Sequence, residues 1–296
     1  MQIEHVDRRF LRIPFNVVFR HASAERGTTS SIWLEARDAS GLCGLGECCP
    51  RPYVTGETLQ GAAAFIDAQL AAVTERVHDL DSLRAWVSEH APEIDRNPAA
   101  WCAMELALLD LLAREQQQPV EALLGQPAIR GPFCYTAVLG DADLGTFTGQ
   151  LERYLQAGFT DFKVKLSGRP EHDSDKLSLF HGDGRAGLSV RLDANNLWDD
   201  WRLAADYLLQ LPGPVSGMEE PLAVNDYPGM VCLYRETGIP IILDESLLRA
   251  GQVAGLAGGI EWRINLRVSK MGGLLRCLDV LQAARSRGIR IIIGAQ

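Results

Sequence analysis

The chain of 296 residues carries a formal net charge of −9, with 47% hydrophobic and 23% charged residues. This composition is typical of a soluble globular protein, and the acidic balance without a basic stripe argues against a nucleic-acid partner. No apolar run is long enough to cross a membrane, and the polar start lacks the apolar core of a signal peptide, so no membrane partner is expected. Seven cysteines without framework spacing fit reduced thiols and a cytoplasmic location.

The first part of the chain, residues 1–125, is predicted to form a small α+β domain. Alternating apolar residues indicate short antiparallel strands at 10–13, 17–19, 31–36 and 43–48. From residue 58 the apolar period changes to 3.6, which predicts a helix over 58–73 and a second helix with Asn97 as its N-cap. Glu105 and Asp110 lie among apolar residues of this second helix, so we expect half-buried acids in structural pairs.

The remainder of the chain, residues 126–296, alternates apolar strands with helical segments. The predicted strands lie near 131–139, 159–166, 189–193, 216–221, 239–244, 262–267 and 289–294. Such alternation implies a parallel sheet closed into a barrel. A complete barrel needs one more helix and one more strand than we count before Gln296. Either the C-terminal end of the barrel is missing from this chain, or the gap is filled in another way.

Charged side chains end the successive apolar runs of this second part. They are Lys165, Asp193, Glu219, Asp244 and Arg267, at spacings of 28, 26, 25 and 23 residues. Each spacing is about the length of a βα unit, and polar groups at the carboxyl ends of parallel strands converge at the top of a barrel. The three carboxylates among them suit Mg²⁺, a hard cation that prefers oxygen ligands.

The lysine pair supplies the other half of a mechanism. Lys163 and Lys165 lie two positions apart on one strand, so their side chains share a face. A lysine beside another cation and a divalent metal is pushed toward its neutral form and can act as a base. A base and a metal together remove a proton α to a carboxylate, since the metal stabilises the developing charge.

The ordered motifs resemble those of the enolase superfamily, specifically the muconate-lactonizing-enzyme (mandelate racemase/muconate cycloisomerase) subgroup. They are Lys163-Val164-Lys165, Asp193-Ala194-Asn195, Glu219-Glu220-Pro221, Asp244-Glu245-Ser246 and Ser269-Lys270-Met271-Gly272-Gly273. The resemblance covers essentially the whole chain. It implies a modified (β/α)7β TIM-like barrel with an N-terminal α+β capping domain, and a homo-oligomer.

The resemblance also implies roles for the residues at the strand ends. The metal, Mg²⁺ with Mn²⁺ as the alternative, is expected on Asp193, Glu219 and Asp244. Lys165 is the expected acid/base, with Lys163 beside it to tune its pKa. The substrate is expected to be a small carboxylate that loses its α-proton.

One position departs from the pattern of the subgroup, which carries a second lysine on the sixth strand. Aligned on the Gly-Gly pair that follows, this position is Arg267, with Lys270 three residues later. Arginine stays protonated and is a poor base, so Arg267 favours a one-base reaction, whereas Lys270 in the site restores a two-base racemisation. Both residues are retained as catalytic candidates.

The leading hypothesis for the function is a cycloisomerase or a syn-lyase similar to o-succinylbenzoate synthase. The alternative is an N-acylamino acid racemase or a dipeptide epimerase. A hypothesis of another class is a catalytically silent member that binds a metal or a small acid without turning it over. Arg267 and the incomplete barrel motivate this last one.

Further candidates lie in loops and beside the strand ends. Two polar cap loops, near 20–26 and 50–57, are expected to close over the substrate, and their candidate contacts are Arg20, His21, Arg51 and Tyr53. Asn195 and Glu245 adjoin the metal ligands and are predicted to support the catalytic groups, Glu245 as the partner of a lysine. Glu220 is left out, because on an ideal strand its side chain faces away from that of Glu219.

Overall fold

The computed structural model describes residues 2–21, 24–182 and 185–295, and side chains within 2–14, 27–182 and 185–295. Within these ranges one antiparallel sheet has three strands, in the order β1 (Ile3–His21), β2 (Ala24–Asp38), β3 (Cys43–Cys48). A parallel sheet has seven strands, in the order β10 (Arg290–Ile293), β9 (Trp262–Leu266), β8 (Ile241–Leu243), β7 (Gly217–Glu219), β6 (Ser189–Asp193), β5 (Asp161–Lys165), β4 (Thr136–Leu139).

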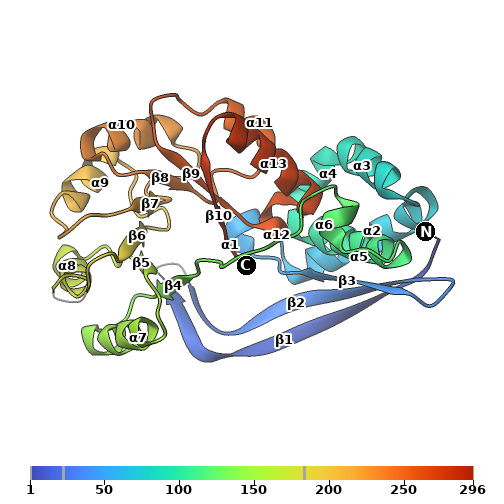
Figure 1. The fold of residues 1–296 in the computed structure, drawn as a ribbon, viewed down its shortest axis with the longest axis horizontal. Helices are drawn as coiled ribbons and strands as arrows, with labels where there is room; N and C mark the ends of the chain where they lie inside the picture. The colour runs from blue at the N-terminus through green and yellow to red at the C-terminus, as the bar shows by residue number, and fades with distance from the viewer. Residues whose placement is uncertain (1, 22–23, 183–184, 296) are drawn as a thin grey trace.

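Helices cover both sheets (Figure 1). Those of the N-terminal part are α1 (Pro52–Thr55), α2 (Leu59–Arg76), α3 (Leu80–Glu89), α4 (Ala91–Arg96), α5 (Pro98–Glu115) and α6 (Val120–Leu123). Those of the parallel part are α7 (Leu144–Gln156), α8 (Pro170–Ser178), α9 (Trp201–Leu208), α10 (Tyr227–Thr237), α11 (Ala250–Ala254), α12 (Val268–Met271) and α13 (Leu274–Ser286). An α+β cap followed by a curled, barrel-type parallel sheet confirms the predicted fold class.

The edges of the parallel sheet are β4 and β10 in the described part of the chain. Side chains on both strands are open to solvent, with Val138 38% and Ile293 74% exposed. The further helix that completes a barrel, and the further strand that would pair with these edges, stay a prediction.

The hairpin of β1 and β2 is longer than the sequence indicated. Antiparallel pairing runs from Ile3↔Asp38 to Phe19↔Arg26 and Arg20↔Glu25, so strand replaces most of the polar loop predicted at 20–26. An antiparallel strand carries polar residues on a face that meets solvent, so a polar run in the sequence can still form strand. The side chains of Arg20 and His21 lie outside the described residues, so their predicted substrate contacts stay predictions.

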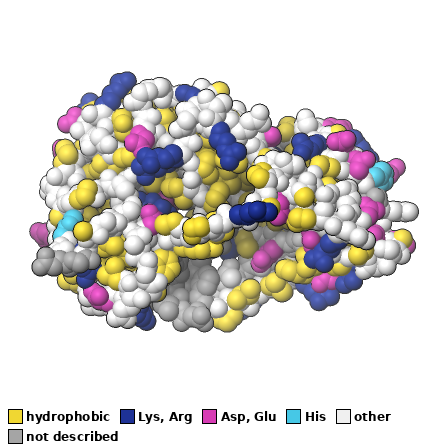
Figure 2. Space-filling view, viewed as in Figure 1, with side chains coloured by type: hydrophobic (Ala, Val, Ile, Leu, Met, Phe, Trp, Pro, Cys, Tyr) yellow, Lys and Arg dark blue, Asp and Glu magenta, His cyan; other side chains and the backbone are white. Residues whose placement is uncertain are grey.

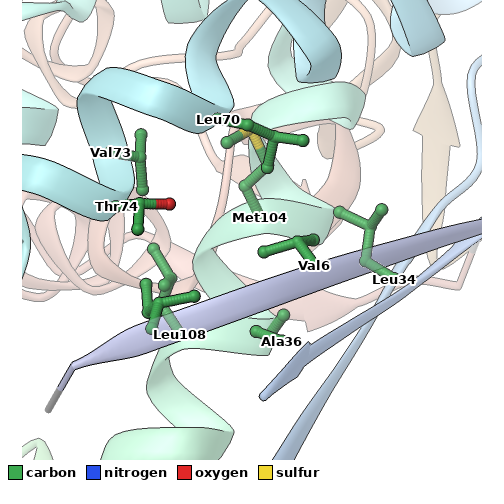
Figure 3. A pocket seen from close by; sticks show the side chains of 10 residues that line it. Val6, Leu34, Ala36, Leu70, Val73, Thr74, Met104 and Leu108 are labelled. Carbon is green, nitrogen blue, oxygen red and sulfur yellow. The ribbon is translucent and has the colours of Figure 1, made fainter. Parts of the chain in front are cut away.

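The core of the cap forms where β2 and β3 pack on α5, which is buried along most of its length. Figure 3 shows a gap between the β1–β2 ribbon and helices α2 and α5. Apolar side chains such as Leu34, Leu70 and Met104 line this gap, and the one polar side chain among its lining residues is Thr74. A ligand would find a single hydroxyl there, so we assign the gap to the hydrophobic core.

The N-terminus of α5 is capped by a residue from a distant loop. Asn97 occupies the predicted N-cap position, but its side-chain amide donates to the carbonyl of Glu93 (3.1 Å) and does not cap the helix. The buried carboxylate of Glu57 accepts from the amides of Ala99 (2.9 Å) and Ala100 (3.0 Å) instead. A carboxylate suits a helix N-terminus because two oxygens and a negative charge face two free N–H groups.

The cap is joined to the barrel by Glu105, which is fully buried and thus lies deeper than predicted. Its carboxylate accepts from Trp101 Nε1 (3.2 Å) within α5 and from the amide of Leu275 (2.9 Å) at the start of α13. A Cβ added at Gly273 would lie 2.4 Å from Glu105 Oε1, so the glycine makes room for this carboxylate. The contact fixes the segment that carries Lys270 against the cap.

We expect Glu105 to make the stability of the fold depend on pH. Burial raises the pKa of Glu105 from 4.5 to about 7, so the folded protein keeps this proton to a higher pH than the unfolded chain does. Stability contributed by the protonated form is therefore lost as the pH rises from about 4.5 to about 7, by about 3 kcal/mol for a shift of this size. Glu105→Gln cannot ionise, so its free energy of unfolding relative to the wild type should rise by that amount between pH 4.5 and 8.

Denaturant unfolding of both proteins across this pH range measures the difference between their free energies of unfolding. The contributions of the other titrating groups cancel in this difference. A difference that stays constant with pH would mean that Glu105 has an ordinary pKa in the folded protein.

On the face shown in Figure 2, basic and acidic side chains are interspersed, and hydrophobic side chains gather where the surface is hollowed between the two lobes. Among the described residues, none of the helices combines the length and the apolar character needed to cross a membrane.

Candidate active site

A row of charged side chains crosses the carboxyl ends of three neighbouring strands. Lys165 on β5 is the Cα partner of Asp193 on β6, and Asp193 is the partner of Glu219 on β7. Their exposed fractions are 8%, 2% and 2%. Neighbouring strands lie about 4.8 Å apart, so parallel register brings these side chains to one place, as the spacing in the sequence predicted.

The two lysines of β5 reach the same carboxylate. Nζ of Lys165 lies 2.8 Å from Asp193 Oδ2 and donates to Asn195 Oδ1 at 2.7 Å. Nζ of Lys163 lies 3.1 Å from Asp193 Oδ2 and 3.1 Å from Glu219 Oε1. The shared face predicted for Lys163 and Lys165 is thus observed, and Asn195 touches the predicted base directly.

The pKa values in this row follow from burial and from the pairing of opposite charges. Burial disfavours the charge of Lys163, but the carboxylates of Glu219 and Asp193 outweigh it and raise the pKa of Lys163 above its ordinary value. The pKa of Glu219 is also raised, in this case by burial, and the positive charge of Lys163 offsets only part of that rise. Lys163 therefore stays an ammonium between two carboxylates.

The third carboxylate, Asp244, follows β8 and is held by two cations. Arg267 Nε donates to Asp244 Oδ1 at 2.9 Å, and its Nη2 donates to Oδ2. Lys270, 1% exposed, donates to Asp244 Oδ1 at 2.6 Å and to the carbonyl of Asp244. Burial opposes ionisation, but Lys270 and Arg267 together hold the pKa of Asp244 well below its usual range. Lys270 is thus bonded within the protein, and Arg267 is the more exposed of the two.

Glu220, which the sequence analysis left out, holds the loop that carries Asp244. Its Oε1 accepts from the amides of Asp244 (2.5 Å) and Ser246 (2.8 Å), and its Oε2 accepts from the Ser246 hydroxyl (2.7 Å). Strand β7 ends at Glu219, and Glu220 has a φ of +41°. The alternation of an ideal strand therefore does not apply to Glu220, and no sequence pattern signals this turn.

Two further side chains support the row. Asn265 on β9 donates to Glu219 Oε1 at 3.1 Å. The sequence analysis missed it, although it precedes Arg267 by two positions and strand alternation places both on one face. Glu245, predicted to be the partner of a lysine, accepts instead from Arg267 Nη2 at 3.3 Å.

The predicted substrate contacts in the second cap loop differ in their surroundings. Arg51 is 7% exposed, and its guanidinium donates to the carbonyls of Ser30 (3.2 Å) and Pro50 (3.0 Å) and to the Thr29 hydroxyl (2.6 Å). It therefore ties this loop to β2. Tyr53 is 48% exposed in α1, where the sequence predicted a loop. A substrate contact by either residue stays a prediction.

The donor set fits a hard cation by its chemistry, with three buried carboxylates at the ends of three neighbouring strands. In the arrangement described, however, no three His, Cys, Asp or Glu side chains of the described residues form a group that could hold a metal ion. The reason is that Lys163 lies between Asp193 and Glu219, while Arg267 and Lys270 hold Asp244. A metal on these carboxylates requires Lys163 and Arg267 to turn away.

Family models match both parts of the chain. The model described as "Mandelate racemase / muconate lactonizing enzyme, N-terminal domain" matches residues 5–125. The model described as "Enolase C-terminal domain-like" matches residues 146–296. The matches cover the cap and the part of the chain that carries every strand-end residue of the site.

Relatives match nearly the full span of the chain. An L-Lys-D/L-Arg epimerase from Methylococcus capsulatus is 30% identical, over 99% of this chain and 82% of its own length. An N-succinyl-L-Arg/Lys racemase from Bacillus cereus is 21% identical, over 100% of this chain and 80% of its own. The structure of a dipeptide epimerase from Methylococcus capsulatus with Mg and L-Arg-D-Lys superimposes with a TM-score of 0.83 at 26% identity, covering 100% of this chain and 83% of that one.

Proposed function

The chain belongs to the mandelate racemase/muconate lactonizing enzyme group of the enolase superfamily, and we propose that it epimerises the α-carbon of dipeptides or N-acylated amino acids with Mg²⁺. The observation that carries this proposal is the row of Lys165, Asp193 and Glu219 at the ends of three paired strands. The names of the relatives support the substrate class, and they favour the epimerase alternative over the cycloisomerase or syn-lyase that headed the sequence analysis.

In the proposed mechanism Lys165 Nζ takes the α-proton from one face of the substrate. Asn195 and Asp193 hold this amine in place, and Lys163 keeps positive charge beside it. Asp193, Glu219 and Asp244 would hold Mg²⁺, which supplies positive charge beside the substrate's carboxylate and so lowers the cost of removing the α-proton. Glu220 keeps the Asp244 loop in position for this role.

Arg267 favours a second candidate, a one-base reaction. Inversion needs a proton delivered on the face opposite Lys165. The residue that aligns with the second lysine of the subgroup is Arg267, directly after β9. The carboxylates of Asp244 and Glu245 raise its pKa above the already high value of arginine, against the effect of burial. Arginine exchanges protons poorly, so we expect deprotonation by Lys165 to be faster than inversion. A cycloisomerisation or syn-elimination, which needs only Lys165, has no such limit.

The test is exchange of the substrate's α-proton in D2O, followed by NMR and chiral chromatography. The panel contains L-Lys-L-Arg, hydrophobic dipeptides, N-succinylamino acids and aromatic acids, each with Mg²⁺ and with EDTA. We expect exchange with Mg²⁺ for a dipeptide or N-acylamino acid, slower inversion, and loss of both with EDTA. Exchange without inversion would favour the one-base reaction, and ring closure or elimination would overturn the epimerase.

The metal ligands are tested separately by thermal unfolding. A ligand that binds only the folded state raises its stability, by about 2.7 kcal/mol at a hundred times Kd. Asp244→Asn should lose the Mg²⁺-induced rise in Tm. Asp110→Asn is the matched control, because Asp110 accepts from the amide of Leu45 (2.9 Å) in the cap and should lose only stability. A rise in Tm with Mg²⁺ and no reaction across the panel would indicate the silent binder.

A further inference from the structure

The chain contains four lysines among its 29 lysines and arginines, and three of them lie in the candidate site: Lys163, Lys165 and Lys270. The other 25 of these cations are arginines. Lysine differs from arginine in its compact ammonium group, which can also lose its proton when buried. The fourth, Lys176 on α8, is fully buried, and its Nζ donates to the backbone carbonyl of Lys165 at 3.1 Å.

The backbone of β5 continues beyond its neighbour β4 at this point. Strand β4 ends at Leu139, which pairs with Val164, so the strand has no partner for the next residues of β5. Backbone groups of a strand alternate between its two neighbours. The amide of Leu166 donates to the backbone carbonyl of Asp193 in β6, at 3.0 Å. The carbonyl of Lys165 and the amide of Ser167 therefore face the opposite side, where β4 has ended.

An ion pair from α8 serves both of these backbone groups. Lys176 donates to the carbonyl of Lys165, and Asp173 Oδ2 accepts from the amide of Ser167 at 2.9 Å. Lys176 and Asp173 are 2.7 Å apart and both fully buried. In a parallel sheet, one residue of the neighbouring strand would donate its amide to the carbonyl of Lys165 and accept, through its own carbonyl, from the amide of Ser167. The ion pair thus supplies the donor and the acceptor of one strand residue.

The remaining polar atoms around the pair complete its hydrogen bonds. Asp173 also accepts from the hydroxyls of Tyr207 (2.6 Å) and Ser167 (3.0 Å). Lys176 Nζ also lies 3.3 Å from Asp141 Oδ1, in the loop that follows β4. The pair therefore fastens the end of β5 to α8, to α9 and to the loop where the strand would have continued.

We propose that Asp173 and Lys176 are positioning residues, which replace the missing strand partner and hold the backbone of Lys165 so that its amine meets the substrate's α-carbon. The role assigned to Lys165 rests on the proposed function. A buried ion pair adds little net stability over apolar residues of similar size, so its contribution here is geometry. A displacement of about 1 Å at a catalytic group can cost a hundredfold in rate.

Two double variants separate positioning from stability. Asp173→Leu/Lys176→Met fills the space with apolar side chains, which commonly replace a buried ion pair without loss of stability, but it cannot bind the backbone. Asp173→Asn/Lys176→Gln removes both charges and keeps one acceptor and one donor. The readouts are kcat and KM for α-proton exchange, the Mg²⁺-induced rise in Tm, and hydrogen exchange of the Ser167 amide.

For the apolar pair we expect kcat to fall by about tenfold to a hundredfold, with KM and the Mg²⁺ response unchanged and the Ser167 amide no longer protected. The amide pair should keep that protection and stay within about threefold of the wild-type kcat. Wild-type kcat with a protected Ser167 amide in the apolar pair would overturn the proposal. A folded amide pair that loses both the wild-type kcat and the protection of the Ser167 amide would also overturn it. The test therefore stays decisive if the apolar pair does not fold.

Failure of the proposed function gives a different result. If the wild type exchanges no α-proton, protection of the Ser167 amide still reports whether the ion pair holds the end of β5. Loss of protection in the apolar pair alone then supports the strand replacement, and unchanged protection overturns it.

Discussion

Lys165→Ala is expected to lower the rate of α-proton exchange by about 10²- to 10⁴-fold, the range that a positioned acid/base contributes. The amine of Lys165 lies beside Asp193 and Asn195. The neighbouring amine of Lys163 lies between Asp193 and Glu219, which raise its pKa against the effect of burial, so it stays protonated and does not replace Lys165 as the base. The three carboxylates proposed to hold Mg²⁺ are unchanged in this variant, so the Mg²⁺-induced rise in Tm should persist. Exchange rates in D2O and thermal unfolding of the variant check both statements.

Lys165→Arg is the matched control for charge. It keeps a cation beside Asp193 but removes the basic amine, because arginine stays protonated. We expect Lys165→Arg to be as inactive as the alanine variant. If the arginine restored exchange, Lys165 would act through its charge, and its assignment as the base would be wrong.

Gly46→Ala is expected to destabilise the cap by about 3–5 kcal/mol, at the upper end of the effects of overpacking. Strand β3 lies directly on the backbone of α5, and a Cβ at Gly46 would meet the carbonyl oxygen of Ala103 at 2.0 Å. Both partners are backbone, so neither a rotamer change nor a shift of a flexible side chain relieves the overlap. Denaturant unfolding measures the loss.

Gly27→Ala is the control, since a Cβ at this glycine of β2 meets nothing within 4 Å. Its free energy of unfolding should stay within about 0.5 kcal/mol of the wild type, as for surface substitutions in general. Gly→Ala lowers the entropy of the unfolded chain and so favours folding where the backbone is compatible. Equal losses at Gly27 and Gly46 would therefore mean that the contact with α5 does not explain the requirement for glycine.

The strand-end residues of the site could be predicted because their pattern is local and repeats. Apolar alternation locates each strand, and parallel pairing brings its carboxyl end beside that of its neighbour. This is why Asp193 and Glu219 meet Lys165 in one row. The shared face of Lys163 and Lys165 follows from the same alternation. The metal and the reaction were inferred from the chemistry of these residues and from the resemblance.

The residues that the sequence did not reveal act across distances in the chain that no local pattern spans. Glu57 caps a helix that begins 41 residues later, and Glu105 accepts from an amide 170 residues away. Glu220 turns toward Asp244 because β7 stops before it and the backbone takes a positive φ.

The sequence alone thus determined the order of the strands and the charged residues at their ends. The reason is that the alternation of side chains along a strand is a local pattern, visible in a few neighbouring residues. The tertiary structure decided which carboxylate is held by which cation, and how β5 is supported once β4 has ended. Those outcomes depend on how helices pack on the sheet, where partners such as Asp173 and Lys176 meet the backbone of Lys165 and Ser167 only after the chain has folded.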